Sequence, residues 1–214
     1  MEKIPFYDLL TILLPGALLT LAIQLFAVEI GFSISDIEMN QYFSLTVFLS
    51  ATIFLGSFLN FLTQIILPFL RMIGLFTPLE KLYARMKKVS NMSDFYENMM
   101  NEIISDTGEE FTYHEKLEGV WIQIYYYLEV NQKIASPKSF QSFYFFFRNF
   151  FTMCLILIFP FVILSFTSMH SKDYLLLSVI DLVAIFLSII AGSWNRKKMV
   201  ERIFWSYYSL KSNS

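Results

Sequence analysis

Four long apolar segments, separated by charged stretches, limit what this chain can fold into more than any other feature. They cover Leu9–Val28, Tyr42–Leu70, Phe150–Ser168 and Tyr174–Trp194. Each reaches or exceeds the length of about 20 residues with which a helix crosses the hydrocarbon core of a bilayer. Because backbone N–H and C=O groups find no water there, such segments cross the bilayer as helices. The sequence therefore predicts an all-α membrane protein with four transmembrane helices.

Charged residues are concentrated between the second and third apolar segments. Only 16% of the chain is charged, whereas a soluble domain has roughly 25%. Most of these charges lie in residues 71–142, where apolar residues recur at helical spacing. We expect a first transmembrane hairpin over residues 1–70, a mainly helical domain inserted over residues 71–142, and a second transmembrane hairpin with a C-terminal helix over residues 143–214.

Positive charge marks one side of the membrane. Lys and Arg follow the second apolar segment, from Arg71 to Lys88, and follow the fourth, from Arg196 to Lys198. The loop over residues 29–41 holds acids and neither Lys nor Arg. Since positively charged loops stay in the cytoplasm, we expect both termini and the domain over residues 71–142 to be cytosolic.

Aromatic and basic residues gather where the third segment begins and where the fourth ends. Arg148 lies in a Phe-rich stretch, and Trp194 is followed by Arg196, Lys197 and Lys198. Aromatic rings and long basic side chains favour the headgroup region, where the charged end reaches water or phosphate. We expect these five residues to anchor the protein at the cytosolic interface, with Arg148 extending to the headgroups.

Three of the polar side chains inside the apolar segments are candidate functional residues. Asp181 is the only acid in the middle of one, and an acid there is costly unless it is paired or hydrated. It either lines a polar lumen or meets a polar partner in an oligomer, or it is a hydrogen-bonded acid that fixes helix packing. Asn60 and Gln64 are one turn apart, and we expect them to make interhelical hydrogen bonds in preference to binding a ligand.

The sequence carries no motif for catalysis, metal binding or cofactor binding. It has neither a Gly-rich phosphate loop nor a nucleophile elbow. Its single cysteine, Cys154, lies inside an apolar segment, and His114 and His170 fall on opposite sides of the membrane in this topology. We therefore expect a protein that is not an enzyme and that holds no metal or cofactor.

The basic residues Arg85, Lys87 and Lys88 follow the second apolar segment closely. One interpretation is contact with lipid headgroups near the membrane surface. The other is a binding site for an anionic ligand, such as a nucleotide or oligonucleotide, or for an acidic face of a partner protein.

Three segments carry a resemblance to known proteins: Pro5–Leu10 with Leu14–Gly16, Tyr127–Asn131 with Arg148–Asn149, and Trp194–Tyr208. In these segments the chain resembles small membrane effectors of bacterial anti-phage defence, of the Hailong or CBASS kind, with the membrane subunit of Kiwa as a second comparison. The resemblance implies an oligomeric protein of the bacterial inner membrane that is silent until infection and then permeabilises the membrane. In the Hailong kind, the cytosolic part binds a DNA oligomer made by a partner nucleotidyltransferase.

These observations together favour a gated pore-forming or membrane-disrupting effector with the cytosolic domain as its sensor. One protomer with four helices has no room for an aqueous pore, so conduction needs a closed ring, and we expect a homotetramer. The alternative is a membrane anchor that conducts nothing and recruits a soluble cytosolic defence protein.

Overall fold

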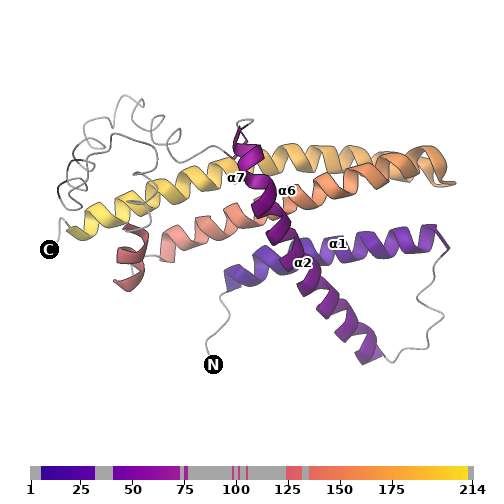
Figure 1. The fold of residues 1–214 in the computed structure, drawn as a ribbon, viewed down its shortest axis with the longest axis horizontal. Helices are drawn as coiled ribbons and strands as arrows, with labels where there is room; N and C mark the ends of the chain where they lie inside the picture. Colours follow the sequence, from indigo (N-terminus) through magenta and orange to yellow (C-terminus); the bar gives the residue numbers. More distant parts are fainter. Residues whose placement is uncertain are drawn as a thin grey trace. The chain divides into compact units, whose positions relative to one another are not determined.

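Four long helices make up most of the computed structural model (Figure 1). It describes residues 6–31, 41–72, 75–76, 98, 101, 105, 124–131 and 135–211. The helices are α1 (Phe6–Glu29), α2 (Gln41–Met72), α6 (Ala135–Thr167) and α7 (Ser171–Lys211), and residues 124–130 are helical as well. None of the described residues is in a β-strand, so the all-helical prediction is confirmed for this part of the chain.

All four long helices are apolar enough and long enough to cross a membrane. This confirms the prediction of four candidate spans and a multi-pass membrane protein. Helix α7 has 41 residues, which at 1.5 Å per residue is about 60 Å and twice the thickness of a hydrocarbon core. One end of α7 must therefore continue beyond any bilayer that the helix crosses. The identity of the membrane and the side that each terminus faces stay predictions.

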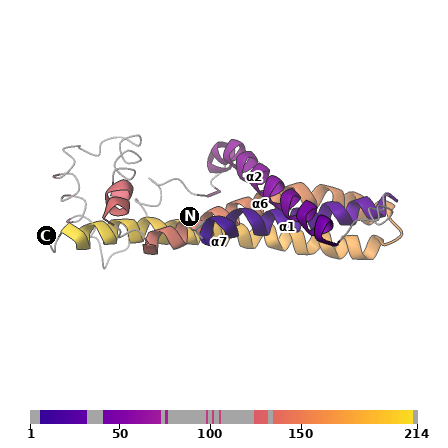
Figure 2. The ribbon, with the colours of Figure 1, turned by 90° about the horizontal axis from the view of Figure 1, so that it is seen from below.

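The chain divides into two compact units, and α6 and α7 contribute residues to both. Unit 1 consists of Met1–Leu70 and Ser142–Gly192, and unit 2 of Arg71–Gln141 and Ser193–Ser214. In unit 1, α6 and α7 form an antiparallel hairpin whose helices lie side by side in both views (Figures 1 and 2). All four long helices contribute to its core, which contains Leu19, Ala22, Leu59, Met153, Cys154, Leu157, Phe161 and Tyr174.

Helices α1 and α2 cross with their backbones in contact. A Cβ atom on Gly16 would collide with the carbonyl oxygen of Thr52, and one on Gly56 would collide with the carbonyl oxygen of Ile12. Small residues at membrane helix crossings allow this approach. Beside the crossing, the two helices leave a groove of about 210 Å³ lined by Thr20, Ile23, Gln24, Ser44, Val47, Phe48, Ala51 and Leu55.

Unit 2 packs the end of α7 against residues 124–130. The rings of Tyr127 and Tyr207 meet edge to face with centroids 5.5 Å apart, and Tyr125 donates a hydrogen bond of 2.9 Å from its hydroxyl to Oε1 of Gln141. The buried side chains here include Ile124, Leu128, Val200, Ile203 and Phe204. The tail of the chain therefore continues the fourth apolar helix and packs on the segment before α6.

Candidate functional site

A cluster of polar groups joins α1, α2 and α6 inside the apolar unit 1. We call it the polar latch and define it as Thr11, Asn60, Thr63, Arg148, Asn149 and Thr152. Its members come from both halves of the unit's sequence and contact one another across helix boundaries. Hydrogen bonds of this kind hold membrane helices together, because lipid tails cannot replace the partner that a polar group loses when the helices separate.

The contact between α1 and α6 depends on a proline. Pro15 lies inside α1 and has no N–H to donate to the carbonyl of Thr11, four residues earlier. The side-chain amide of Asn149 donates to that carbonyl oxygen over 3.1 Å. A freed carbonyl in a membrane helix is expected to find its donor on a neighbouring helix, and here α6 supplies it.

The contact between α2 and α6 has a charged part. Arg148 is only 3% exposed and donates from its guanidinium to Oδ1 of Asn60 over 3.2 Å. Its guanidinium carbon also lies 4.8 Å from the ring centroid of Phe145 and 5.7 Å from that of Tyr144. This differs from the expectation that Arg148 extends to the headgroups, because an amide and two aromatic rings within the protein already accommodate its charge.

A second contact between α2 and α6 joins two threonines. Thr63 donates from its hydroxyl to the hydroxyl of Thr152 over 2.8 Å. The Thr152 hydroxyl in turn donates to the carbonyl of Arg148 in its own helix over 3.2 Å. Both side chains are buried, so this pair is shielded from water and lipid.

Asp181 lies outside the latch, between α6 and α7. Its side chain is 6% exposed and has the Cys154 thiol of α6 as a neighbour. The second carboxyl oxygen, Oδ2, has no hydrogen-bond partner among the described residues. Within one protomer Asp181 is therefore buried, and the choice between the two roles expected from the sequence stays a prediction.

Gln64 and Asn60 lie on differently exposed parts of α2. Asn60 is half-buried and belongs to the latch, whereas Gln64 is exposed on the surface of α2. In the part of the chain that the structure describes, no hydrogen bond of Gln64 is present. The structure thus assigns different surroundings to the two amides that the sequence treats together.

A further polar contact, which the sequence did not reveal, ties the end of α1 to the turn between α6 and α7. Glu29 accepts hydrogen bonds from the hydroxyl of Ser168 and, over 3.0 Å, from the hydroxyl of Tyr174. Nδ1 of His170 lies 3.8 Å from the same carboxylate. The sequence held a signal for this contact: an acid at the end of the first apolar segment and a polar turn after the third. A four-span topology brings both to one side of the membrane.

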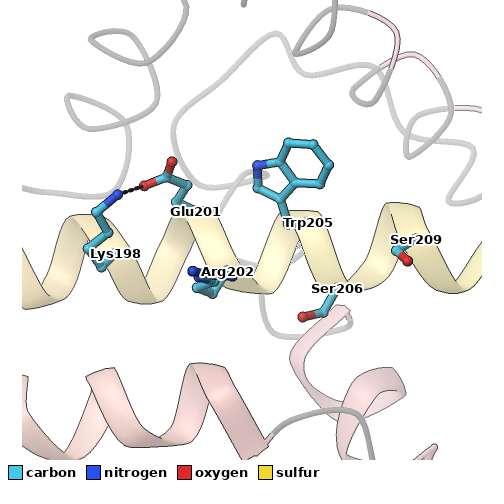
Figure 3. A pocket seen from close by; sticks show the side chains of 6 residues that line it. All are labelled: Lys198, Glu201, Arg202, Trp205, Ser206 and Ser209. Atoms are coloured by element: carbon cyan, nitrogen blue, oxygen red, sulfur yellow. Dashed lines mark hydrogen bonds and ion pairs between the residues drawn. The ribbon is translucent and has the colours of Figure 1, made fainter.

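The anchor residues predicted at the end of the fourth segment lie on α7 in different surroundings. Trp194 and Lys197 are exposed, whereas Arg196 is buried. Lys198 forms an ion pair of 2.9 Å with Glu201, beside an open groove of about 500 Å³ (Figure 3). In the described part of the chain this groove is lined by α7 alone, with Lys198, Glu201, Arg202, Trp205, Ser206 and Ser209.

The predicted anion-binding residues Arg85, Lys87 and Lys88 lie outside the described residues. Among the residues described, no group of three or more His, Cys, Asp or Glu side chains is placed to hold a metal ion. Comparison of the chain with protein-family models, curated proteins and solved structures gives no match.

Proposed function

We propose that the chain is an oligomeric inner-membrane effector of anti-phage defence, which opens a pore or disrupts the membrane when its cytosolic domain receives a signal. The four apolar helices support a membrane location. The defence role rests on the resemblance of its N-terminal, central and tail segments to such effectors. The polar latch is the observation that carries the gated activity.

The latch supports gating because it holds together helices that lipid can otherwise separate. Apolar helix surfaces gain little from one another in a bilayer, since lipid tails are equally apolar. Three hydrogen bonds of the latch, from Thr63, Arg148 and Asn149, connect α6 to α1 or α2. Breaking these bonds loosens the first hairpin from the second at the latch, while the Glu29 contacts at the end of α1 stay in place.

Helix α6 offers a route from the signal to the latch. It is continuous from Ala135 to Thr167, so it begins in unit 2 and carries Arg148, Asn149 and Thr152 roughly four to five turns further along. A ligand or partner that rotates or pulls the first turns of α6 acts directly on the latch. The trigger in this proposal is a nucleotide, an oligonucleotide or a soluble partner such as a nucleotidyltransferase, bound near Arg85, Lys87 and Lys88.

Valine substitutions test the latch without a known trigger. Thr63→Val and Thr152→Val keep the shape of the side chain and remove the hydroxyl that joins α2 to α6. An interhelical hydrogen bond in a membrane is worth about 0.6 kcal/mol, so each variant in dye-loaded liposomes should leak roughly threefold faster than the wild type. Thr20→Val is the matched control, because the Thr20 hydroxyl bonds the Gly16 carbonyl of its own helix.

Leakage equal to that of the wild type for both latch variants, with folding intact by circular dichroism, contradicts the gating proposal. The second candidate function, a non-conducting anchor, is favoured by the burial of both Arg148 and Asp181 inside the protomer. An anchor of this kind retains a soluble partner on inner-membrane vesicles without leaking. Co-sedimentation of a soluble cytosolic protein with such vesicles, without dye leakage, separates the two functions.

A further inference from the structure

The surface of α2 that faces away from the core differs from the exposed face of α7 in unit 1. On α7, the exposed residues between Tyr174 and Ala191 are all large and apolar: Leu175, Leu176, Val179, Ile180, Leu182, Val183, Phe186, Leu187 and Ile190. On α2, by contrast, Ser50, Ser57 and Gln64 are exposed. Helix faces that meet lipid are apolar, whereas faces that meet other helices are enriched in small and polar residues.

These polar residues follow a regular repeat. Ser50, Ser57 and Gln64 recur at every seventh residue, and Phe54 and Phe61 recur at the same interval between them. The spacing alternates between four and three residues, as it does for the contact residues of a left-handed pair of packed helices. Phe54 and Phe61 are 70% and 61% exposed, so this row of five residues is uncovered in a single protomer.

The side chain of Gln64 indicates that this row of residues does not simply face lipid. Its amide lies in an apolar helix and makes no hydrogen bond within the described residues. Hydrocarbon offers neither a donor nor an acceptor. An amide carries both a carbonyl acceptor and an N–H donor, so two identical Gln64 side chains that face each other satisfy one another.

We propose that a second copy of this chain packs on the α2 seam, which we define as Ser50, Phe54, Ser57, Phe61 and Gln64. The seam is self-complementary, because each Phe of one copy enters the space that the small serines of the other copy leave. Both copies have the same orientation in the membrane, so the two α2 helices run parallel and Gln64 meets Gln64. This gives the oligomer of the proposed function one contact surface between two copies. The contact itself does not depend on the proposed function, and only its biological role rests on that function.

Cysteine cross-linking in native membranes tests the contact directly. In a Cys154→Ser background, Ser57→Cys should form a disulfide-linked dimer when the membranes are oxidised with copper phenanthroline. Phe58→Cys is the matched control: it lies at the same depth on the same helix and is exposed, but it points about 100° away from the seam. Phe186→Cys serves as a lipid-facing control on α7.

A dimer band for Ser57→Cys at least fivefold stronger than for either control supports the seam. Equal bands at all three positions indicate random collision and overturn the proposal, as does the absence of any band. Leakage does not enter this measurement, so the seam can fail while the latch variants still leak, and the reverse outcome is equally visible.

A second measurement avoids introduced cysteines altogether. Gln64→Leu should weaken association of the detergent-solubilised protein roughly threefold, as judged by the concentration dependence of its mass in light scattering. Gln24→Leu is the control, since Gln24 is also exposed in an apolar helix but lines the groove between α1 and α2 instead. Equal affinity of the Gln64→Leu variant and the wild type contradicts pairing of the amides.

Discussion

Arg148 illustrates how a charged side chain is accommodated inside an apolar helical unit. A cation between transmembrane helices needs partners within the protein, because lipid supplies none. The Asn60 amide accepts from its guanidinium, and the Phe145 ring lies against it. The planar guanidinium suits this combination of hydrogen bond and stacking, and a lysine ammonium does not. The charge is therefore used to join α6 to α2.

Asp181 is covered by the protein itself, and this gives a prediction at the level of one residue. In a Cys154→Ser background, Asp181→Cys should react at least tenfold more slowly with a water-soluble thiol reagent than Lys197→Cys, which lies at an exposed position. The reason is that the position is 6% exposed and packs against α6. The reaction rate in unactivated membranes is the measurement. Rapid labelling at rest means that the position faces water, as a lumen requires.

At the level of the helix, α1 shows which parts of the arrangement the sequence contains. The Pro15-Gly16 pair predicts a point of close packing and a freed carbonyl, and both occur: Gly16 touches α2, and the Thr11 carbonyl receives a donor. The sequence does not identify that donor as Asn149, because the pairing depends on the register between α1 and α6. Register between helices is set by packing, which periodicity alone does not encode.

The polar residues of the spans show the same limit. Helical spacing predicts that Asn60 and Gln64 share one side of α2, yet Asn60 meets Arg148 and Gln64 remains exposed. Residues four apart differ by about 40° around a helix, and that angle separates the packed edge from the open face here. The sequence predicts that Arg148 extends to the headgroups, whereas the structure places it beside Asn60. The sequence does not reveal this contact, because Asn60 belongs to another helix.

The crossing of α1 and α2 gives a prediction at the level of two helices. Gly56→Ala places a methyl group against the backbone carbonyl of Ile12, which cannot move without shifting α1. Overpacking of this kind costs about 1–3 kcal/mol, and the loss should appear as a lower midpoint of thermal unfolding in detergent. Ala51→Val is the control, because Ala51 lines the groove beside the crossing and has room for two more methyl groups. An unchanged midpoint for Gly56→Ala means that the helices do not touch there.

For the whole molecule, the contacts of Glu29 bear on how the chain crosses the membrane. They bring the end of α1 to the turn between α6 and α7, so the outer ends of the two hairpins lie at the same end of unit 1. A four-span protein with both termini on one side requires this arrangement. Positive residues near the other ends of the spans favour the cytosol for those ends.

This topology predicts which positions an impermeant reagent can reach. In a Cys154→Ser background, Met169→Cys should be labelled by a membrane-impermeant maleimide on intact spheroplasts, because Met169 lies fully exposed in the turn after α6. Arg202→Cys, exposed on the last part of α7, should be labelled only after the membrane is broken. Labelling of both positions before lysis contradicts the topology, unless the latch has opened and admits the reagent. The Thr20→Val and Thr63→Val variants resolve that case, because only Thr63→Val weakens the latch. If the reagent enters through an open latch, Thr63→Val increases the labelling of Arg202→Cys and Thr20→Val does not.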